Sequence, residues 1–376
     1  EEALSKGAKY SVVDEKKYVT NDTIILVKNV LETLQQLSTY HRKKLNIPII
    51  GLTGSNGKTT TKELINTVLK TQFKTTATKG NLNNHIGVPL TLLSMTPNTE
   101  IGIVEMGANH HKEIAFLCSI AKPDFGYITN FGKAHLEGFG SLEGVIKAKS
   151  ELYDYLKSND KTAFVNTADT IQVEKTKDIK TIPFNNSIQF IDANPFVKVK
   201  FENQIIQTNL IGSYNFSNIS AAITIGKHYN ISNENIKMAL ENYQSTNNRS
   251  QILKTKNNNT IILDAYNANP TSMKAALENF SNSASQAKIV FLGDMFELGN
   301  NYKEEHQFIN DYCKELNLKN VFLIGELFSE IETDYTQFNT FDLLPEFLEN
   351  SDFKNQHILI KGSRGMALER ILNFIN

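Results

Sequence analysis

A glycine-containing turn between an apolar run and a polar helical stretch constrains this chain more than any other feature. The stretch IPIIGLTGSNGKTTTKEL (47–64) begins with β-branched and apolar side chains, which are typical of a buried strand. Gly54 and Gly57 allow a tight turn, and the helix expected from Lys58 directs its free N–H groups and positive dipole end at that turn. We therefore predict a nucleotide-binding loop formed by Gly54, Ser55, Asn56, Gly57, Lys58, Thr59 and Thr60.

The loop departs from the Walker A spelling G-x-x-x-x-G-K-[ST], because Leu52 stands where that pattern requires glycine. Lys58 can still neutralise β- and γ-phosphates, and the Thr59 hydroxyl can reach Mg²⁺. The GKT triplet alone leaves open a strand-to-helix turn that binds no ligand. The strand before it and the helix after it favour nucleotide binding.

Short apolar runs alternate with amphipathic stretches along the chain, which predicts an α/β protein with mainly parallel strands. Expected strands in the first series are Ile47–Thr53, Ile101–Glu105, Phe125–Thr129 and Thr162–Asn166, with helices at 58–72, 112–121, 142–157 and 215–229 and a β-rich stretch at 180–211. Expected strands in the second series are Thr260–Asp264, Lys288–Gly293, Val321–Gly325 and His357–Lys361, with helices at 271–281, 303–316 and 365–375. The fold predicted is a central P-loop-type mononucleotide-binding domain with a mainly parallel sheet, followed by a C-terminal Rossmann-like α/β domain.

Length and composition limit the number of domains, the partners and the cellular setting that we expect. The 376 residues have room for two or three domains, which we expect at 1–45, 46–245 and 246–376. A formal charge of −1 indicates no nucleic-acid partner, and no apolar run approaches the roughly 20 residues needed to span a bilayer. The two cysteines, Cys118 and Cys313, form no paired motif, which favours a reducing, cytoplasmic setting.

Polar residues follow two of the other expected strands. Glu105 ends the strand at 101–105, and Asn130 and His135 follow the strand at 125–129. Because ligands of open parallel sheets lie beyond the carboxyl ends of the strands, these side chains should share a crevice with Lys58. A carboxylate and an imidazole are suitable ligands for a divalent ion beside a triphosphate. The alternatives are a solvated charge for Glu105 and a backbone-satisfied loop histidine for His135.

Lys149 falls within an apolar helical stripe. Val145, Ala148, Leu152 and Leu156 share one face of the helix expected at 142–157, whereas Lys147 points the opposite way. Desolvation of Lys149 would favour its neutral amine, which can react with CO₂ to give a metal-binding carbamate. The alternative is that the side chain extends past its neighbours to water.

The segment TKGNLNNHIGVPLTLL (78–93) is dense in amide side chains. Asn83 and Asn84 are candidates for binding a sugar or peptide. Both can instead cap the helix that follows.

Together these residues resemble the Mur ligase family of peptidoglycan synthesis. The family uses a shortened loop of the form TGxxGK[ST], present here from Thr53 to Thr59, and a carbamylated lysine in K-x-x-[IL]-[FY], matched from Lys149 to Tyr153. The resemblance implies that Thr59, Glu105, His135 and carbamylated Lys149 organise Mg²⁺, with two ions expected. It implies catalytic roles for Lys58, His135 and Lys149.

The resemblance extends to residues expected to contact the nucleotide and to residues of the third domain. Asn215 and Asn218 lie in a segment matching H-N-x-x-N-x-x-A-A, in which Tyr214 replaces the histidine, and Arg249 and Asp264 match residues that close over ribose and phosphates. Residues 1–45 resemble the closing part of the family's UDP-sugar-binding domain, which is much longer. Four segments resemble the branch that joins D-alanyl-D-alanine to UDP-N-acetylmuramoyl-tripeptide: EMGANH, DAYNANPTSM (264–273), LGDMFELG (292–299) with His306, and KGSRGM (361–366).

The activity implied is amide formation driven by ATP. The tripeptide carboxylate would take the γ-phosphoryl group, and the dipeptide amine would then displace phosphate from the acyl phosphate. Candidates for contacting the dipeptide are Asn267, Asn269, Ser363 and Arg364, and a monomer is expected. Alternatives are another amino-acid ligase of the Mur or folylpolyglutamate synthetase type, a P-loop NTPase switch, and a non-catalytic binding protein.

Overall fold

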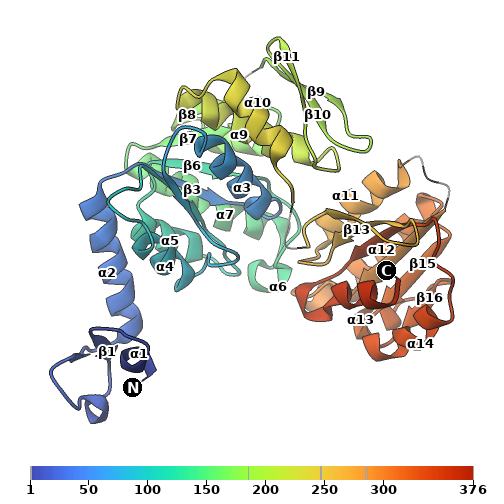
Figure 1. The fold of residues 1–376 in the computed structure, drawn as a ribbon, viewed down its shortest axis with the longest axis horizontal. Coiled ribbons are helices and arrows are strands. Elements are labelled where there is room, and N and C mark those ends of the chain that lie inside the picture. The colour runs from blue at the N-terminus through green and yellow to red at the C-terminus, as the bar shows by residue number, and fades with distance from the viewer. Residues whose placement is uncertain (1, 185, 246–247, 284, 286, 376) are drawn as a thin grey trace.

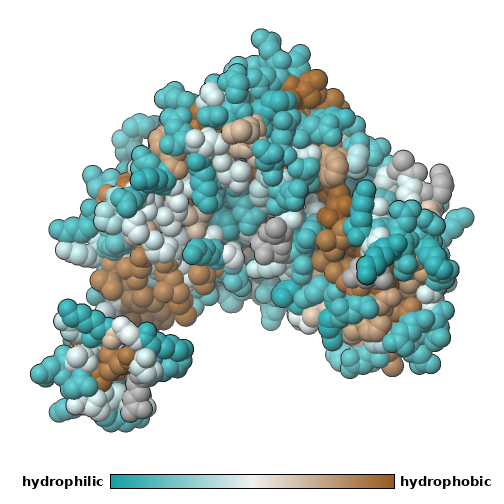
Figure 2. Space-filling model, viewed as in Figure 1, coloured by the Kyte–Doolittle hydropathy of each residue, from teal (hydrophilic) through white to brown (hydrophobic). Residues whose placement is uncertain are grey.

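The structure is a computed structural model that describes residues 2–184, 186–245, 248–283, 285 and 287–375. Figure 1 shows an arch in which α2 carries a small N-terminal module away from the central domain and the C-terminal domain lies on the opposite side. Figure 2 shows the hollow under the arch between these two parts. Among the described helices, none is both long and apolar enough for a membrane span.

Helix α2 fastens the N-terminal module to the central domain. The Arg42 guanidinium donates to Ala121 O, to Lys122 O and, at 2.6 Å, to Asp124 Oδ2, and the Arg42 side chain is 9% exposed. Asp124 also accepts from the Ile49 N–H, so this ion pair sits at the start of the central sheet. The elements of this part are α1 (Glu2–Ser5), β1 (Ser11–Val13), β2 (Ile24–Leu26) and α2 (Val30–Leu45).

The central domain is built on a six-stranded sheet in which every neighbouring pair is parallel. Its strands, in spatial order, are β4 (Thr75–Ala77), β5 (Ile101–Glu105), β3 (Ile49–Thr53), β6 (Phe125–Ile128), β7 (Thr162–Val165) and β8 (Lys180–Pro183). Strands β3 and β5 are buried along their whole length, as apolar runs covered on both faces should be. The prediction of a mainly parallel sheet is confirmed.

Helices cover both faces of this sheet. One core contains α3 (Lys58–Leu69), α9 (Asn215–His228) and α10 (Asn233–Asn242). The other contains α4 (Gly87–Leu93), α5 (Glu113–Ala121), α6 (Leu136–Phe139) and α7 (Leu142–Ser158). Helix α8 (Thr170–Lys175) joins β7 to β8.

The β-rich stretch expected at 180–211 divides between two sheets. Its first strand, β8, completes the parallel sheet, and the remaining strands form a separate antiparallel sheet in the order β11-β10-β9. These strands are β9 (Ile188–Asp192), β10 (Lys198–Phe201) and β11 (Gln204–Gln207).

The C-terminal domain has a second six-stranded sheet, parallel except for its edge strand β12. Its strands, in spatial order, are β12 (Gln251–Lys254), β13 (Thr260–Asp264), β17 (His357–Lys361), β14 (Lys288–Gly293), β15 (Asn320–Ile324) and β16 (Thr336–Phe338). Its helices are α11 (Pro270–Ser281), α12 (Tyr302–Glu315), α13 (Glu326–Ser329), α14 (Leu344–Glu349) and α15 (Leu372–Ile375).

One predicted helix is wrong. The stretch 365–375 is not continuous, because Ala367 has a left-handed φ of 47° and separates two 3₁₀ turns before the short α15. An alanine in that conformation cannot continue a right-handed helix, and nothing in the apolar spacing indicated the break. The boundary expected at 245/246 adjoins residues 246–247, which lie outside the described residues. Both cysteines are buried and free, in accordance with the expected lack of a disulfide.

Candidate active site

A cleft of about 1070 Å³ opens between the central domain and the C-terminal domain. The carboxyl ends of β3, β5 and β6 meet there, as expected for ligand sites of open parallel sheets. Of the predicted site residues, the cleft is lined by Ser55, Asn56, Gly57, Lys58, Thr59, Thr60, Asn83, Asn84, Glu105, His135, Asn215, Asn218, Arg249, Asp264, Asn267 and Asn269.

The phosphate loop has the predicted strand–turn–helix form. Gly54 has a φ of 142°, and a Cβ atom there would lie 2.0 Å from Thr129 Oγ1, so only glycine fits. Gly57, with a φ of 76°, directly precedes α3. Lys58 Nζ donates to Gly54 O at 2.8 Å and to Ser55 O at 3.2 Å. Desolvation by burial lowers the pKa of Lys58, although nearby Glu105 favours the charged form.

Glu105 lies beside this loop with only 1% of its surface exposed. Its two oxygens accept from Thr59 Oγ1 at 2.9 Å and from Asn83 Nδ2 at 2.8 Å. The alternative of a solvated strand-end charge is therefore wrong. A buried carboxylate beside a hydroxyl supplies the oxygen ligands that Mg²⁺ prefers.

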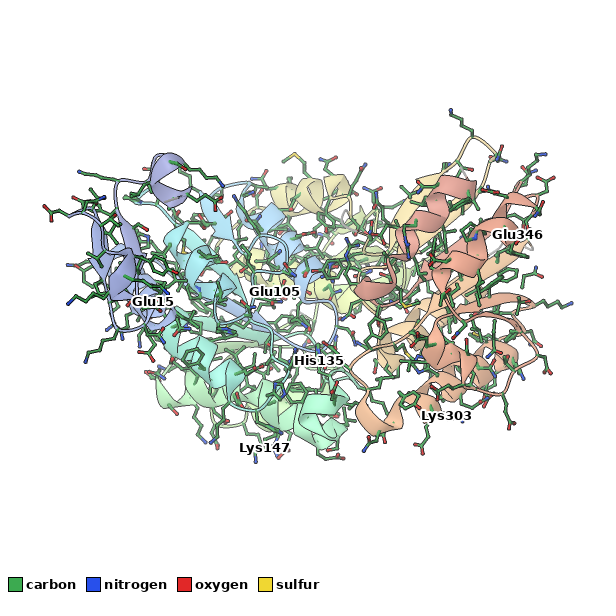
Figure 3. The ribbon with its side chains drawn as sticks, turned by 90° about the horizontal axis from the view of Figure 1, so that it is seen from below. Glu15, Glu105, His135, Lys147, Lys303 and Glu346 are labelled. Carbon is green, nitrogen blue, oxygen red and sulfur yellow. The ribbon has the colours of Figure 1, made fainter. Side chains whose placement is uncertain are left out.

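His135 faces the C-terminal domain. Its Nδ1 lies 2.5 Å from Glu297 Oε2, and the Glu137 N–H donates to Glu297 O. The His135 side chain lowers the pKa of Glu297 despite partial burial. Figure 3 shows Glu105 and His135 in the middle part of the molecule, where these domains meet. The sequence reasoning missed Glu297; the only signal was its place in the LGDMFELG block.

Lys149 is fully buried, which excludes the alternative that its side chain extends to water. Val145, Ala148, Leu152 and Leu156 are also fully buried, as the helical spacing predicts, whereas Lys147 is exposed and points outward (Figure 3). Lys149 Nζ donates to Ala108 O at 3.0 Å, and Ala108 lines the cleft. Desolvation first, and then the nearby Lys58 charge, hold the pKa of Lys149 well below its ordinary value. Lys149 itself lies just behind the residues that line the cleft.

Asn215 and Asn218 form a hydrogen-bonded chain on α9. Asn218 Oδ1 accepts from Thr61 Oγ1, Asn218 Nδ2 donates to Asn215 Oδ1, and Asn215 Nδ2 donates to Ile211 O. These hydrogen bonds fix both amides against α3, the helix that follows the phosphate loop. Tyr214, where a histidine was expected, has its hydroxyl 3.0 Å from Ser250 Oγ.

Arg249 and Asp264 approach the cleft from the C-terminal domain. The Arg249 guanidinium stacks 3.8 Å from the centre of the Tyr266 ring. Asp264 accepts from the Ser250 N–H at 3.0 Å and from Lys361 Nζ at 2.6 Å. The Lys361 side chain is 2% exposed, so Asp264 is held by a buried cation that the sequence reasoning did not select.

The substrate candidates differ in their surroundings. Asn84 Oδ1 accepts from the Ile86 and Gly87 N–H groups in the turn that leads into α4, so its carbonyl oxygen is already engaged by the backbone. Ser363 is buried and accepts from the Phe296 N–H, and exposed Arg364 pairs with Glu369 at 2.9 Å. Neither Ser363 nor Arg364 is among the residues that line the cleft, and their contact with substrate stays a prediction.

No trio of His, Cys, Asp or Glu within the described ranges is close enough to hold a metal ion by itself. An ion held largely by phosphate oxygens needs only one or two protein ligands, and Thr59 with Glu105 fits that requirement. At His135, Glu297 faces Nδ1, which leaves Nε2 as the ring nitrogen for a ligand.

Comparison with known proteins agrees with this geometry. Residues 52–226 match the Mur ligase middle domain, and residues 248–364 match the Mur ligase glutamate ligase domain. The UDP-N-acetylmuramoyl-tripeptide–D-alanyl-D-alanine ligase of Bacillus subtilis is 37% identical over 373 residues, which cover 94% of this chain and 81% of that protein.

Solved structures give the same result. MurF ligase from Thermotoga maritima in complex with ADP has a TM-score of 0.87 at 26% identity, over all of this chain and 90% of that one. MurF from Acinetobacter baumannii has a TM-score of 0.86 at 28% identity, over 98% of this chain and 85% of that one. The chain belongs to the Mur ligase family, within the group of UDP-N-acetylmuramoyl-tripeptide–D-alanyl-D-alanine ligases.

Proposed function

We propose that this protein joins D-alanyl-D-alanine to UDP-N-acetylmuramoyl-tripeptide with ATP, in the synthesis of peptidoglycan precursors. The observation that carries the proposal is that the phosphate loop, Glu105 and the C-terminal residues Arg249 and Asp264 line one cleft. A ligase of this kind must bring a nucleotide, a carboxylate and an amine together, and the cleft between two domains provides room for all three.

Phosphoryl transfer requires positioning and charge neutralisation more than covalent help from the protein. Lys58 would neutralise phosphate oxygens, and the N–H groups at the start of α3 would cradle them. Arg249, fixed on Tyr266, and Asp264, fixed by Lys361, would contact the nucleotide from the C-terminal domain. The tripeptide carboxylate would then receive the γ-phosphoryl group, and the dipeptide amine would replace phosphate at the carbonyl carbon.

Magnesium would be held by Thr59 and Glu105, with His135 and carbamylated Lys149 as ligands of a second ion. When bound, it offsets the repulsion between a carboxylate and a triphosphate. Support for the carbamate comes from the full burial and lowered pKa of Lys149, since a neutral amine is the form that adds CO₂. The monomeric state, the cytoplasmic setting and the domain limits 1–45, 46–245 and 246–376 stay predictions.

The test is phosphate release from ATP in the presence of UDP-N-acetylmuramoyl-tripeptide, with and without D-alanyl-D-alanine. We expect release to depend on both substrates, with the dipeptide appearing in the product. Release that needs neither substrate would favour a P-loop NTPase switch. Equal use of single amino acids in place of the dipeptide would favour another ligase of the family.

A further inference from the structure

The backbone of Asn56, in the middle of the phosphate loop, is held by side chains of the central domain. Its N–H donates to Asn130 Oδ1 at 3.0 Å, and its carbonyl oxygen accepts from Asn130 Nδ2 at 3.0 Å and from Thr129 Oγ1 at 2.6 Å. Three hydrogen bonds to the two peptide groups that flank the Asn56 Cα atom fix the direction in which its side chain leaves the loop.

That side chain meets a residue of the C-terminal domain. Asn269 Nδ2 donates to Asn56 Oδ1 at 2.7 Å, joining residues 213 positions apart in the chain. Asn269 directly precedes α11 and is 6% exposed. The phosphate loop is therefore in direct contact with the start of a helix in the other domain.

The orientation of the Asn269 amide follows from its other hydrogen bonds. Its Oδ1 accepts from the Ser272 N–H at 2.9 Å, and its own N–H donates to Ser272 Oγ at 3.1 Å, which together form a capping box. Turning the amide over would place an NH₂ group against the Ser272 N–H and leave two donors facing each other. Because Asn269 Oδ1 caps α11, the NH₂ group of Asn269 must face Asn56.

Neighbouring contacts join the same two surfaces. The Lys133 N–H donates to Thr271 Oγ1 at 3.0 Å, and Lys133 Nζ pairs with Glu305 at 2.6 Å. These contacts lie on the same side of the cleft as the hydrogen bond between Asn56 and Asn269, two residues that also line the cleft.

We propose that Asn269 is a positioning residue of the ATP site, which holds the phosphate loop through Asn56 when the C-terminal domain closes. The sequence had suggested that Asn269 contacts the dipeptide, but its amide is already occupied at both ends. The inference rests on the proposed function, since it takes ATP as the ligand of the loop. A ligand that favours closure must bind more weakly when the hydrogen bond between Asn269 and Asn56 is removed, because binding and closure are linked.

The test uses Asn269→Ser, because serine retains a helix-capping oxygen but is too short to reach Asn56. Removing one net hydrogen bond should weaken ATP and ADP binding by roughly fivefold, and Asn56→Ala should have a similar effect. Combining the two should add little, because each variant removes the same bond. Asn282→Ser, at the exposed far end of α11, is the matched control and should leave binding unchanged.

The readouts are ADP binding by calorimetry, and kcat and KM for each substrate. We expect a raised KM for ATP with the KM for the dipeptide unchanged. A raised dipeptide KM with normal ADP binding, or additive effects of the two variants on ADP binding, would overturn the proposal. ADP binding does not depend on which amide is made, so failure of the ligase assignment would be seen separately, in the substrate dependence of phosphate release.

Discussion

The burial of His306 in the C-terminal domain predicts how much the free energy of unfolding changes with pH. The His306 side chain is completely buried; its Nε2 accepts from the Met295 N–H at 3.0 Å, and its Nδ1 donates to Tyr302 O at 2.6 Å. Both ring nitrogens are thus satisfied in the neutral tautomer. Protonation would put a second N–H against the Met295 N–H, so burial and geometry both oppose the charged form.

Desolvation lowers the pKa of His306 from its ordinary 6.5 to about 4, although Tyr302 O and the Glu330 charge act in the opposite direction. Because the folded pKa is lowered, the unfolded chain binds more protons between these two values, and stability falls as the pH falls through this window. The free energy of unfolding should lose about 2 kcal/mol at pH 5 and about 3 kcal/mol at the acid limit from this group.

The measurement is urea unfolding of the C-terminal domain in the intact protein, at pH 8 and pH 5, for wild type and His306→Gln. Glutamine cannot titrate and can present an oxygen to the Met295 N–H. The variant should be less stable than wild type at pH 8, and the difference between them should shrink by about 2 kcal/mol at pH 5. His85→Gln, at an exposed position, serves as the control. An unchanged difference between wild type and His306→Gln across this range would refute the reasoning.

Three further predictions follow from single contacts. Lys149→Ala should lower activity at least about tenfold and regain part of it with a small carboxylic acid, and full activity of the variant would contradict the carbamate. Gly54→Ala should abolish calorimetric ADP binding while circular dichroism stays native, because the added Cβ would lie 2.0 Å from Thr129 Oγ1. Arg42→Ala should lower the free energy of unfolding by about 3 kcal/mol in a urea titration, since it leaves Asp124 without its buried partner. An unchanged midpoint would show that Lys161, the other cation on Asp124, is sufficient.

Sequence reasoning succeeded where the relevant information is local. The phosphate loop needs a buried strand, two glycines and a helix in succession, and all lie within 18 residues. The burial of Lys149 follows from the 3.6-residue period of a single helix. Glu105 could be placed because parallel strands end at a common edge.

The same reasoning did not reach contacts between residues that are distant in the sequence. Lys361 ends a strand and lies 97 positions from Asp264, so only the β13–β17 pairing reveals that the two side chains meet. Asn269 was selected for a different role, because its contact with Asn56 depends on how the domains pack. Spacing within a segment carries no information about which distant segment it will face.

The contact between Glu297 and His135 predicts an effect on Mg²⁺ binding. Its carboxylate faces Nδ1 of His135, and a carboxylate in that position orients a ligating histidine and raises the basicity of its other nitrogen. If His135 binds Mg²⁺ as proposed, Glu297→Gln should raise the Mg²⁺ concentration needed for half-maximal activity by about 10- to 100-fold. Glu330→Gln, in the same domain but paired with Tyr302, is the matched control. An unchanged Mg²⁺ requirement in Glu297→Gln would mean that the His135–Glu297 pair acts only as a contact between the domains.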